Sequence, residues 1–291
     1  MEEYISDNSL YIRSKNNSMI NRKMIGRVLG MLLFIELGMF LLCAGVSAGY
    51  GESDYKYFLY TCIINAVVGG LLLLYGRGAE NKMSRRDGYC VVTLSWVFFT
   101  FFGMLPFYFS GSIDTITNAF FETMSGFTTT GATILDDIES LSHGMLFWRS
   151  LTQWIGGLGI VFFTIAILPI FTTGGVQLFS AESTGVTHDR THPKINVMAK
   201  WLWTIYLVLT ISETVLLMFG GMSLFDAICQ SFATTATGGY STKQNSISYW
   251  NSPYIEYVVA IFMIVSSINF SLFLMCLKGK VGRLFKDEEL H

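Results

Sequence analysis

The sequence predicts an all-α integral membrane protein with six transmembrane helices and two short re-entrant helices, each followed by an extended loop. Three observations lead to this prediction. Hydrophobic residues make up 52% of the 291 residues and charged residues only 14%, whereas soluble domains contain roughly 25% charged residues. The apolar residues are gathered in long runs between polar segments. The order of long apolar run, short amphipathic run, Thr/Gly loop and long apolar run occurs twice, which predicts two copies of one architecture.

The predicted spans follow from runs of about twenty apolar residues, the length needed to cross a bilayer. They cover residues 24–50, 57–76, 88–109, 147–171, 201–220 and 254–277. Two shorter segments, 112–126 and 224–233, begin near residues that can cap a helix and reach about three turns, too few to cross. Gly156 and Gly157, inside the fourth span, would allow a neighbouring helix to approach closely.

A loop of Thr and Gly follows each short segment. With the two loops aligned about 107 residues apart, Gly131 pairs with Gly238, Thr128 with Thr235 and Thr130 with Thr237. Non-helical backbone at membrane depth is tolerated only where it is buried in protein or lines a wet cavity. Because carbonyl oxygens can replace the hydration shell of a cation, two matched loops indicate an ion path. The alternative, loops that only pack the spans together, is disfavoured by the recurrence.

Loop charge supports this topology independently. Six crossings place the N-terminal tail, residues 77–86, residues 172–200 and the C-terminal tail on one side, and these segments hold nearly all the Lys and Arg. Basic segments stay cytoplasmic, so both termini are predicted inside and both Thr/Gly loops open from outside. The predicted units are a cytoplasmic tail (1–23), a leading helix pair (24–87), a first pore repeat (88–180), and a second pore repeat with a cytoplasmic tail (181–291).

The chain resembles the Trk/Ktr/HKT superfamily of potassium transporters, and within it the bacterial Trk-type membrane subunit. The resemblance covers nearly the whole chain and rests on FETMSGFTTTGAT at 121–133, RSLTQWIGGLG at 149–159 and AESTG at 181–185, with further likeness at 201–206, 226–242 and 269–270. It implies four span–pore-helix–span repeats around one pore, with one carbonyl-lined filter loop per repeat. It also implies a homodimer in the bacterial inner membrane, resting on cytosolic nucleotide-binding regulatory subunits.

The resemblance assigns roles to individual positions. The implied potassium-binding carbonyls belong to Thr129, Thr130, Gly131, Ala236, Thr237 and Gly238, and the implied supporting positions are Thr128, Ala132, Thr235 and Gly239. A glycine at position 131 implies potassium rather than sodium. The chain departs from the family by carrying two of the four repeats, so we expect either a piece of a longer protein or halves that assemble in pairs.

Acidic side chains inside the predicted membrane segments are functional candidates by default. We expect Glu122 to brace the first short helix against Arg149 or a backbone amide. Glu36, in the leading pair, is expected to be structural, whereas for Glu213 a structural and a functional role stay equally open. The five scattered cysteines are expected to be buried hydrophobes.

Two other function classes stay open at this point. A secondary transporter would bind a small solute at broken helices and would favour an inverted repeat. Here an even number of predicted crossings separates the two repeats, so they have the same orientation in the membrane. An intramembrane enzyme would use Glu122, Glu213 or His143. His188 and His192 could share a helical face, but no third ligand is evident, so no transition-metal site is expected. We expect no enzymatic activity, no cofactor and no nucleic-acid partner, with K⁺ as the transported ion.

Overall fold

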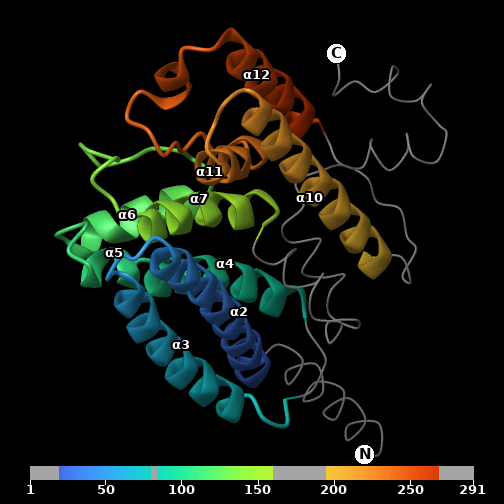
Figure 1. The fold of residues 1–291 in the computed structure, drawn as a ribbon. Helices are drawn as coiled ribbons and strands as arrows, with labels where there is room; N and C mark the ends of the chain where they lie inside the picture. The colour runs from blue at the N-terminus through green and yellow to red at the C-terminus, as the bar shows by residue number, and fades with distance from the viewer. Residues whose placement is uncertain (1–19, 80–83, 160–194, 269–291) are drawn as a thin grey trace, which may run out of the picture.

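A computed structural model describes residues 20–79, 84–159 and 195–268 (Figure 1). Within these ranges the chain is helical and has no strand. Its elements are α2 (Arg22–Gly49), α3 (Tyr55–Tyr75), α4 (Arg85–Gly103), α5 (Leu105–Phe109), α6 (Ile116–Phe127), α7 (His143–Gly157), α10 (Ile195–Phe219), α11 (Leu224–Thr235), the 3-10 helix η2 (Ser246–Trp250) and α12 (Pro253–Ser267).

Four stretches are long and apolar enough to cross a membrane: Arg22–Gly49, Tyr55–Tyr75, Arg86–Phe109 and Trp201–Phe219. They confirm a helix at the first, second, third and fifth predicted spans. The third is interrupted at Met104, between α4 and α5. Pro106 lies at the start of α5 and has no N–H with which to continue the α4 hydrogen-bond ladder.

The two remaining spans differ from the prediction. Instead of running unbroken from 147 to 171, α7 starts at His143 and ends at Gly157, with Gly159 at φ 73° just beyond it. Glycine in the left-handed region is a common helix terminator, so Gly159 explains why the helix ends here although the apolar run continues. Similarly, α12 ends at Ser267 rather than near 277, because Ile268 is already extended. Residues 160–171 and 269–277 lie outside the described part of the chain.

The helix order repeats with matching lengths. Residues 85–109, which hold α4 and α5, correspond to the 25 residues of α10; α6 and α11 each have 12 residues, and α7 and α12 each have 15. Twelve residues of helix reach only about 18 Å, short of the roughly 30 Å hydrocarbon core. Each short helix has a hydroxyl N-cap, since Thr115 accepts from the Asn118 amide and Ser223 from the Asp226 amide.

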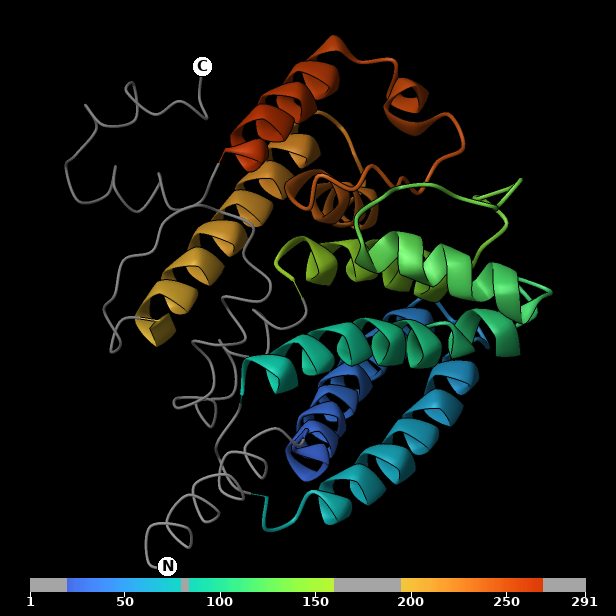
Figure 2. The same cartoon turned by 180° about the vertical axis from the view of Figure 1, so that it is seen from behind.

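Most of the apolar core belongs to the first half of the chain. There α2 packs against α3, α4 and α7, while a smaller cluster lies between α10, α11 and α12. The view from behind shows α7 and α11 side by side at the junction of the two halves (Figure 2). The structure therefore brings the loops after α6 and α11 to one place.

Glu36 belongs to the leading pair rather than to this junction. Its side chain is fully buried, and Asn65 of α3 donates a hydrogen bond to it at 3.1 Å. Gly103 of α4 lies against its other oxygen. These contacts join three helices, as a structural role requires.

Candidate functional site

Helix α6 ends in a Schellman motif, which turns the chain sharply into the first Thr/Gly loop. The Thr129 amide donates to the Gly126 carbonyl at 3.0 Å, and the Thr130 amide to the Ser125 carbonyl at 3.0 Å. The motif needs a left-handed residue just past the cap, a position usually taken by glycine. Here it is Thr129, at φ 52°, a strained conformation for a β-branched residue.

Helix α11 ends in the same way. The Thr237 amide donates to the Thr234 carbonyl at 2.9 Å, the Gly238 amide donates to the Ala233 carbonyl at 2.8 Å, and Thr237 has φ 54°. Strained residues of this kind gather at functional sites. Finding the same strained turn at the same place in both copies supports a shared role for the two loops.

The shared motif corrects the alignment of the loops by one residue. Counted from the helix ends, Gly131 corresponds to Gly239, with φ values of 75° and 86°, and not to Gly238. The spacing between the copies is therefore 108 residues at α6 and α11, not 107. Aligning the two loops by residue identity pairs the two Thr-Gly dipeptides, whereas the backbone register is set by the residue that ends each helix.

The two loops touch each other at their glycines. A Cβ atom on Gly131 would overlap the carbonyl oxygen of Gly238, so only glycine fits there. The structure thus brings the two predicted loops together at residues from opposite repeats.

Within the described residues, the six carbonyls predicted to bind an ion accept no hydrogen bond; they are those of Thr129, Thr130, Gly131, Ala236, Thr237 and Gly238. The next carbonyl along the first loop is different. Ala132 accepts from the Ser125 hydroxyl at 2.6 Å and from the Tyr240 hydroxyl at 3.3 Å. The open carbonyls therefore form a limited stretch between a helix end and a hydrogen-bonded anchor.

The side chain of Glu122 anchors the first loop from behind. It is buried and accepts from Arg149 Nε at 2.8 Å, from the Thr133 hydroxyl at 2.9 Å and from the Ile134 amide at 3.0 Å. Buried charges are stable only when paired and hydrogen-bonded. The sequence predicted that Glu122 braces the short helix against Arg149 or a backbone amide; the structure shows both partners, and the amide, that of Ile134, belongs to the loop.

Arg149 also reaches the second loop. Its Nη1 donates to the Ser241 carbonyl at 3.0 Å, and its guanidinium lies 3.6 Å from the centre of the Tyr240 ring. The Tyr240 hydroxyl donates to the Glu122 carbonyl at 2.8 Å. No role is expected for Tyr240 from the sequence. Its place directly after the Gly-Gly pair of the second loop was the one available signal.

Two glycines of α7 allow it to pack against both loops. A Cβ atom on Gly156 would overlap the Phe127 carbonyl, and one on Gly157 would lie 2.8 Å from Ala236 of the second loop. The predicted close approach is confirmed, and it involves the ends of both short helices at once.

Glu213 lies behind the second short helix. It is fully buried, and the Thr235 hydroxyl donates to it at 3.4 Å, while its other oxygen has no partner among the described residues. His143 instead pairs with Glu52 at 2.7 Å. Glu122, Glu213 and His143 thus belong to three separate hydrogen-bond sets, an arrangement that does not favour the enzyme hypothesis.

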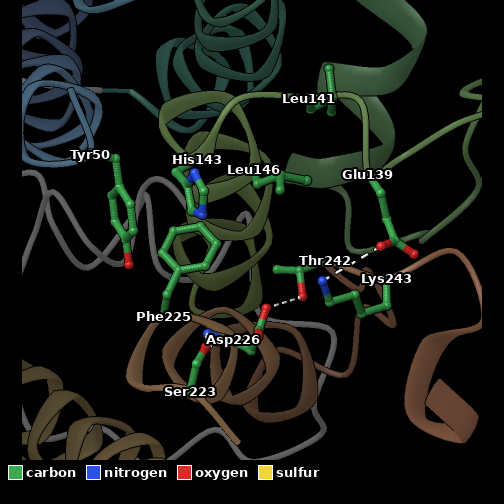
Figure 3. Close-up of a pocket in the computed structure, with 10 residues that line it drawn as sticks. All are labelled: Tyr50, Glu139, Leu141, His143, Leu146, Ser223, Phe225, Asp226, Thr242 and Lys243. Carbon is green, nitrogen blue, oxygen red and sulfur yellow. Dashed lines mark hydrogen bonds and ion pairs between the residues drawn. The ribbon is translucent and has the colours of Figure 1, made fainter. Parts of the chain in front are cut away.

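An open pocket of about 280 Å³ lies where the two halves meet, beside His143 (Figure 3). Tyr50 stacks on the His143 ring at 3.9 Å, and Phe225 of α11 meets the same ring edge-on at 4.8 Å. The charged groups of the pocket are mostly engaged, because Asp226 accepts from the Thr242 hydroxyl at 2.6 Å and Lys243 lies 3.6 Å from Glu139. No sequence prediction pointed to this pocket.

Metal-ligating side chains do not gather in the described part of the chain, where no group of three His, Cys, Asp or Glu residues could hold a metal ion. His188 and His192 lie outside the described residues.

Comparison with known proteins shows the family of the chain. A family model described as TrkH, a cation transport protein, matches residues 55–289. The chain belongs to this family. A transport family gives no support to the enzyme hypothesis.

Several relatives of the TrkH family are similar over most of the chain. The Trk system potassium uptake protein TrkH of Escherichia coli K12 is 41% identical over 268 residues, which cover 91% of this chain and 56% of that protein. TrkG of the same organism is 32% identical over 271 residues, covering 92% of this chain and 56% of TrkG. The chain therefore spans about half the length of these relatives.

A solved structure shows the same fold. The crystal structure of the potassium transporter TrkH from Vibrio parahaemolyticus matches with a TM-score of 0.79 and 34% identity, covering 94% of this chain and 56% of that one. The described helices thus follow the membrane fold of the TrkH family.

Proposed function

We propose that this chain forms part of a potassium uptake path, in which the ion passes along backbone carbonyls of the loops after α6 and α11. The observation that carries the proposal is the set of six open carbonyls on two strained, matching loops that meet at Gly131 and Gly238. The ion-binding residues are Thr129, Thr130, Gly131, Ala236, Thr237 and Gly238, with Thr128, Ala132, Thr235 and Gly239 in support.

The chemistry of this site suits a dehydrated monovalent cation. Carbonyl oxygens replace a hydration shell without adding fixed charge, and the C-terminal ends of α6 and α11 add partial negative charge beside the loops. Divalent cations favour carboxylate ligands, whereas the six open groups are neutral carbonyls, and Glu122 is already held by Arg149 and two loop donors. The names of the relatives specify potassium among the monovalent cations.

The same proposal includes the finer organisation of the chain. Six spans with α6 and α11 re-entrant would place both termini in the cytoplasm and both loops open to the outside of the bacterial inner membrane. The unit boundaries would be 1–23, 24–87, 88–180 and 181–291. Two loops supply part of a ring of carbonyls, and further repeats in the same or another polypeptide would complete it. We also propose a homodimer that binds a cytosolic nucleotide-binding subunit; the word "system" in the names of the relatives supports a multi-component assembly.

Rubidium and sodium uptake by Gly239→Ala, with Gly111→Ala as its matched control, tests the filter assignment. Both glycines have positive φ, 86° and 71°, and neither has a neighbour that a Cβ atom would meet. Each alanine therefore introduces similar strain, about 1–2 kcal/mol, and only Gly239 belongs to a proposed filter loop.

In cells that lack other potassium uptake, we expect Gly239→Ala to lower the preference for rubidium over sodium by about tenfold, the ratio that about 1.4 kcal/mol produces. Gly111→Ala should retain the wild-type preference. Equal preferences in the two variants would contradict the filter assignment, and a wild-type assembly with all its repeats that takes up no rubidium would contradict the transport proposal itself.

A further inference from the structure

The buried amide of Gln153 lies behind the contact between the two loops. Gln153 is on α7, one helical turn after Arg149, and its side chain is fully buried. Its Oε1 accepts a hydrogen bond from the Tyr240 amide at 3.0 Å. This bond joins α7 of the first repeat to the backbone of the second loop.

The amide of Gln153 also packs against the glycines of both loops. A Cβ atom on Gly238 would lie 2.6 Å from its Nε2 and Oε1, so the glycine there makes room for the amide. Its Nε2 lies 3.9 Å from the Cβ position of Gly131 and has no hydrogen-bond partner among the described residues. A buried donor without a partner is costly, and such a group in a native structure is a sign of a role beyond packing.

The bond to Tyr240 bears directly on filter geometry. Tyr240 is two residues after Gly238, whose carbonyl meets Gly131. Fixing the Tyr240 amide therefore limits how far the Gly238 carbonyl can move toward or away from the first loop. Discrimination between potassium and sodium depends on the number and placement of such carbonyls.

We propose that Gln153 is a positioning residue for ion selectivity: by holding the Tyr240 amide, it sets the place of the Gly238 carbonyl against the first loop. This inference rests on the proposed function and assigns a role to a side chain that contributes no carbonyl to the path. Gln153 acts through the second loop although it belongs to the first repeat.

The chain offers a matched control in Gln244. Its Oε1 also accepts a backbone amide across the two repeats, from Ile138 at 3.0 Å, but its side chain is exposed and lies in the loop beyond Tyr240. Gln153→Met and Gln244→Met each remove one such bond with little change of side-chain volume. Only Gln153→Met leaves the buried backbone amide of Tyr240, next to the proposed filter, without an acceptor.

The experiment measures rubidium and sodium uptake in cells. A cooperative thermal unfolding transition of the purified variant in detergent shows that it is folded. We expect Gln153→Met to change the rubidium-to-sodium ratio by about tenfold, and Gln244→Met to change it less than about twofold, as is usual for an exposed side chain. Gln153→Asn keeps a neutral amide at this buried position but is one methylene too short to hold the Tyr240 amide, and we expect it to change the ratio in the same direction.

The outcomes separate the inference from the function on which it rests. A wild-type ratio in folded Gln153→Met, or the same change in both Met variants, would overturn the role of Gln153 while leaving potassium transport intact. If Gln153→Met does not fold, Gln153→Asn decides: a changed ratio supports the positioning role, and a wild-type ratio overturns it. A wild-type assembly with all its repeats that takes up no rubidium would refute the proposed function instead.

Discussion

The two Thr/Gly loops have the same backbone turn but are held in different ways. Both follow a 12-residue helix, and both place a threonine in the left-handed region, Thr129 in one and Thr237 in the other. Behind the first loop is the buried pair of Glu122 and Arg149. At the position of the second repeat that corresponds to Glu122 is Gln230, whose Oε1 has no partner among the described residues.

The two loops are held differently because a helix of the first repeat, α7, also binds the loop of the second repeat. Arg149 and Gln153, both on α7, bind the backbone of the second loop at Ser241 and Tyr240. Among the described residues, no side chain of α12 makes a corresponding bond to the first loop. Matching backbone turns therefore do not imply independent units, because α7 of the first repeat bonds to the backbone of the second loop.

Replacement of Arg149, which contacts both loops, should lower the free energy of unfolding more than any other change proposed below. Arg149→Met leaves Glu122 as an unpaired buried charge and frees the Ser241 carbonyl, so we expect the free energy of unfolding to fall by about 3–5 kcal/mol. Thermal or denaturant unfolding in detergent measures this loss. In the double variant with Glu122→Gln, part of the stability should return, because the buried charge is gone.

Lys243→Met provides the control for charge removal. Lys243 lies 3.6 Å from Glu139 on the partly exposed surface of the second loop, where an ion pair contributes roughly 0–1 kcal/mol. A loss of similar size in Arg149→Met and Lys243→Met would show that the buried pair does not hold the loops.

Relief of the two strained threonines should have a smaller effect, and an equal one in both repeats. Thr129→Gly and Thr237→Gly each remove a side chain from the left-handed region, which should stabilise the folded state by about 1 kcal/mol. Thr130→Gly is the control, since Thr130 has no positive φ and glycine there should destabilise by about 0.5–1 kcal/mol. Melting temperatures that rise in only one of the two repeats would refute the shared turn.

The smallest expected effect concerns the start of α7, which is capped more strongly than α12. The Glu52 carboxylate accepts from the amides of His143 and Gly144 at 2.9 and 3.3 Å, whereas the N-cap of α12, Ser252, makes no side-chain cap bond. Partial burial alone would raise the pKa of Glu52. Hydrogen bonds from the His143 amide and ring and from the Gly144 amide outweigh burial and lower the pKa from its ordinary 4.5.

A carboxylate with a lowered pKa stabilises the fold above its unfolded pKa, and the gain is lost as pH falls through the folded value. The melting temperature of wild type should therefore exceed that of Glu52→Gln at neutral pH. The difference should shrink as pH falls below 4.5. Ser53→Ala, in the same loop, removes no carboxyl, so its difference from wild type should stay constant with pH. A difference between wild type and Glu52→Gln that stays constant with pH would contradict the cap.

The sequence by itself determined the helical class, the place of four long apolar helices and the two short helices that are too short to cross. Apolar run length and capping residues act locally, so they can be read without a structure. The brace of Glu122 by Arg149 was also predictable, because a buried acid in an apolar setting needs a partner.

Only the tertiary structure decided how the loops align, meet and are held. The register of 108 residues depends on the residue at which each helix ends, and Gly159 stops α7 where the apolar run alone suggests continuation. The contact of Gly131 with Gly238, and the reach of Gln153 to Tyr240, join residues from opposite repeats. Such contacts depend on how α7 packs between α6 and α11, which no local pattern in the sequence specifies.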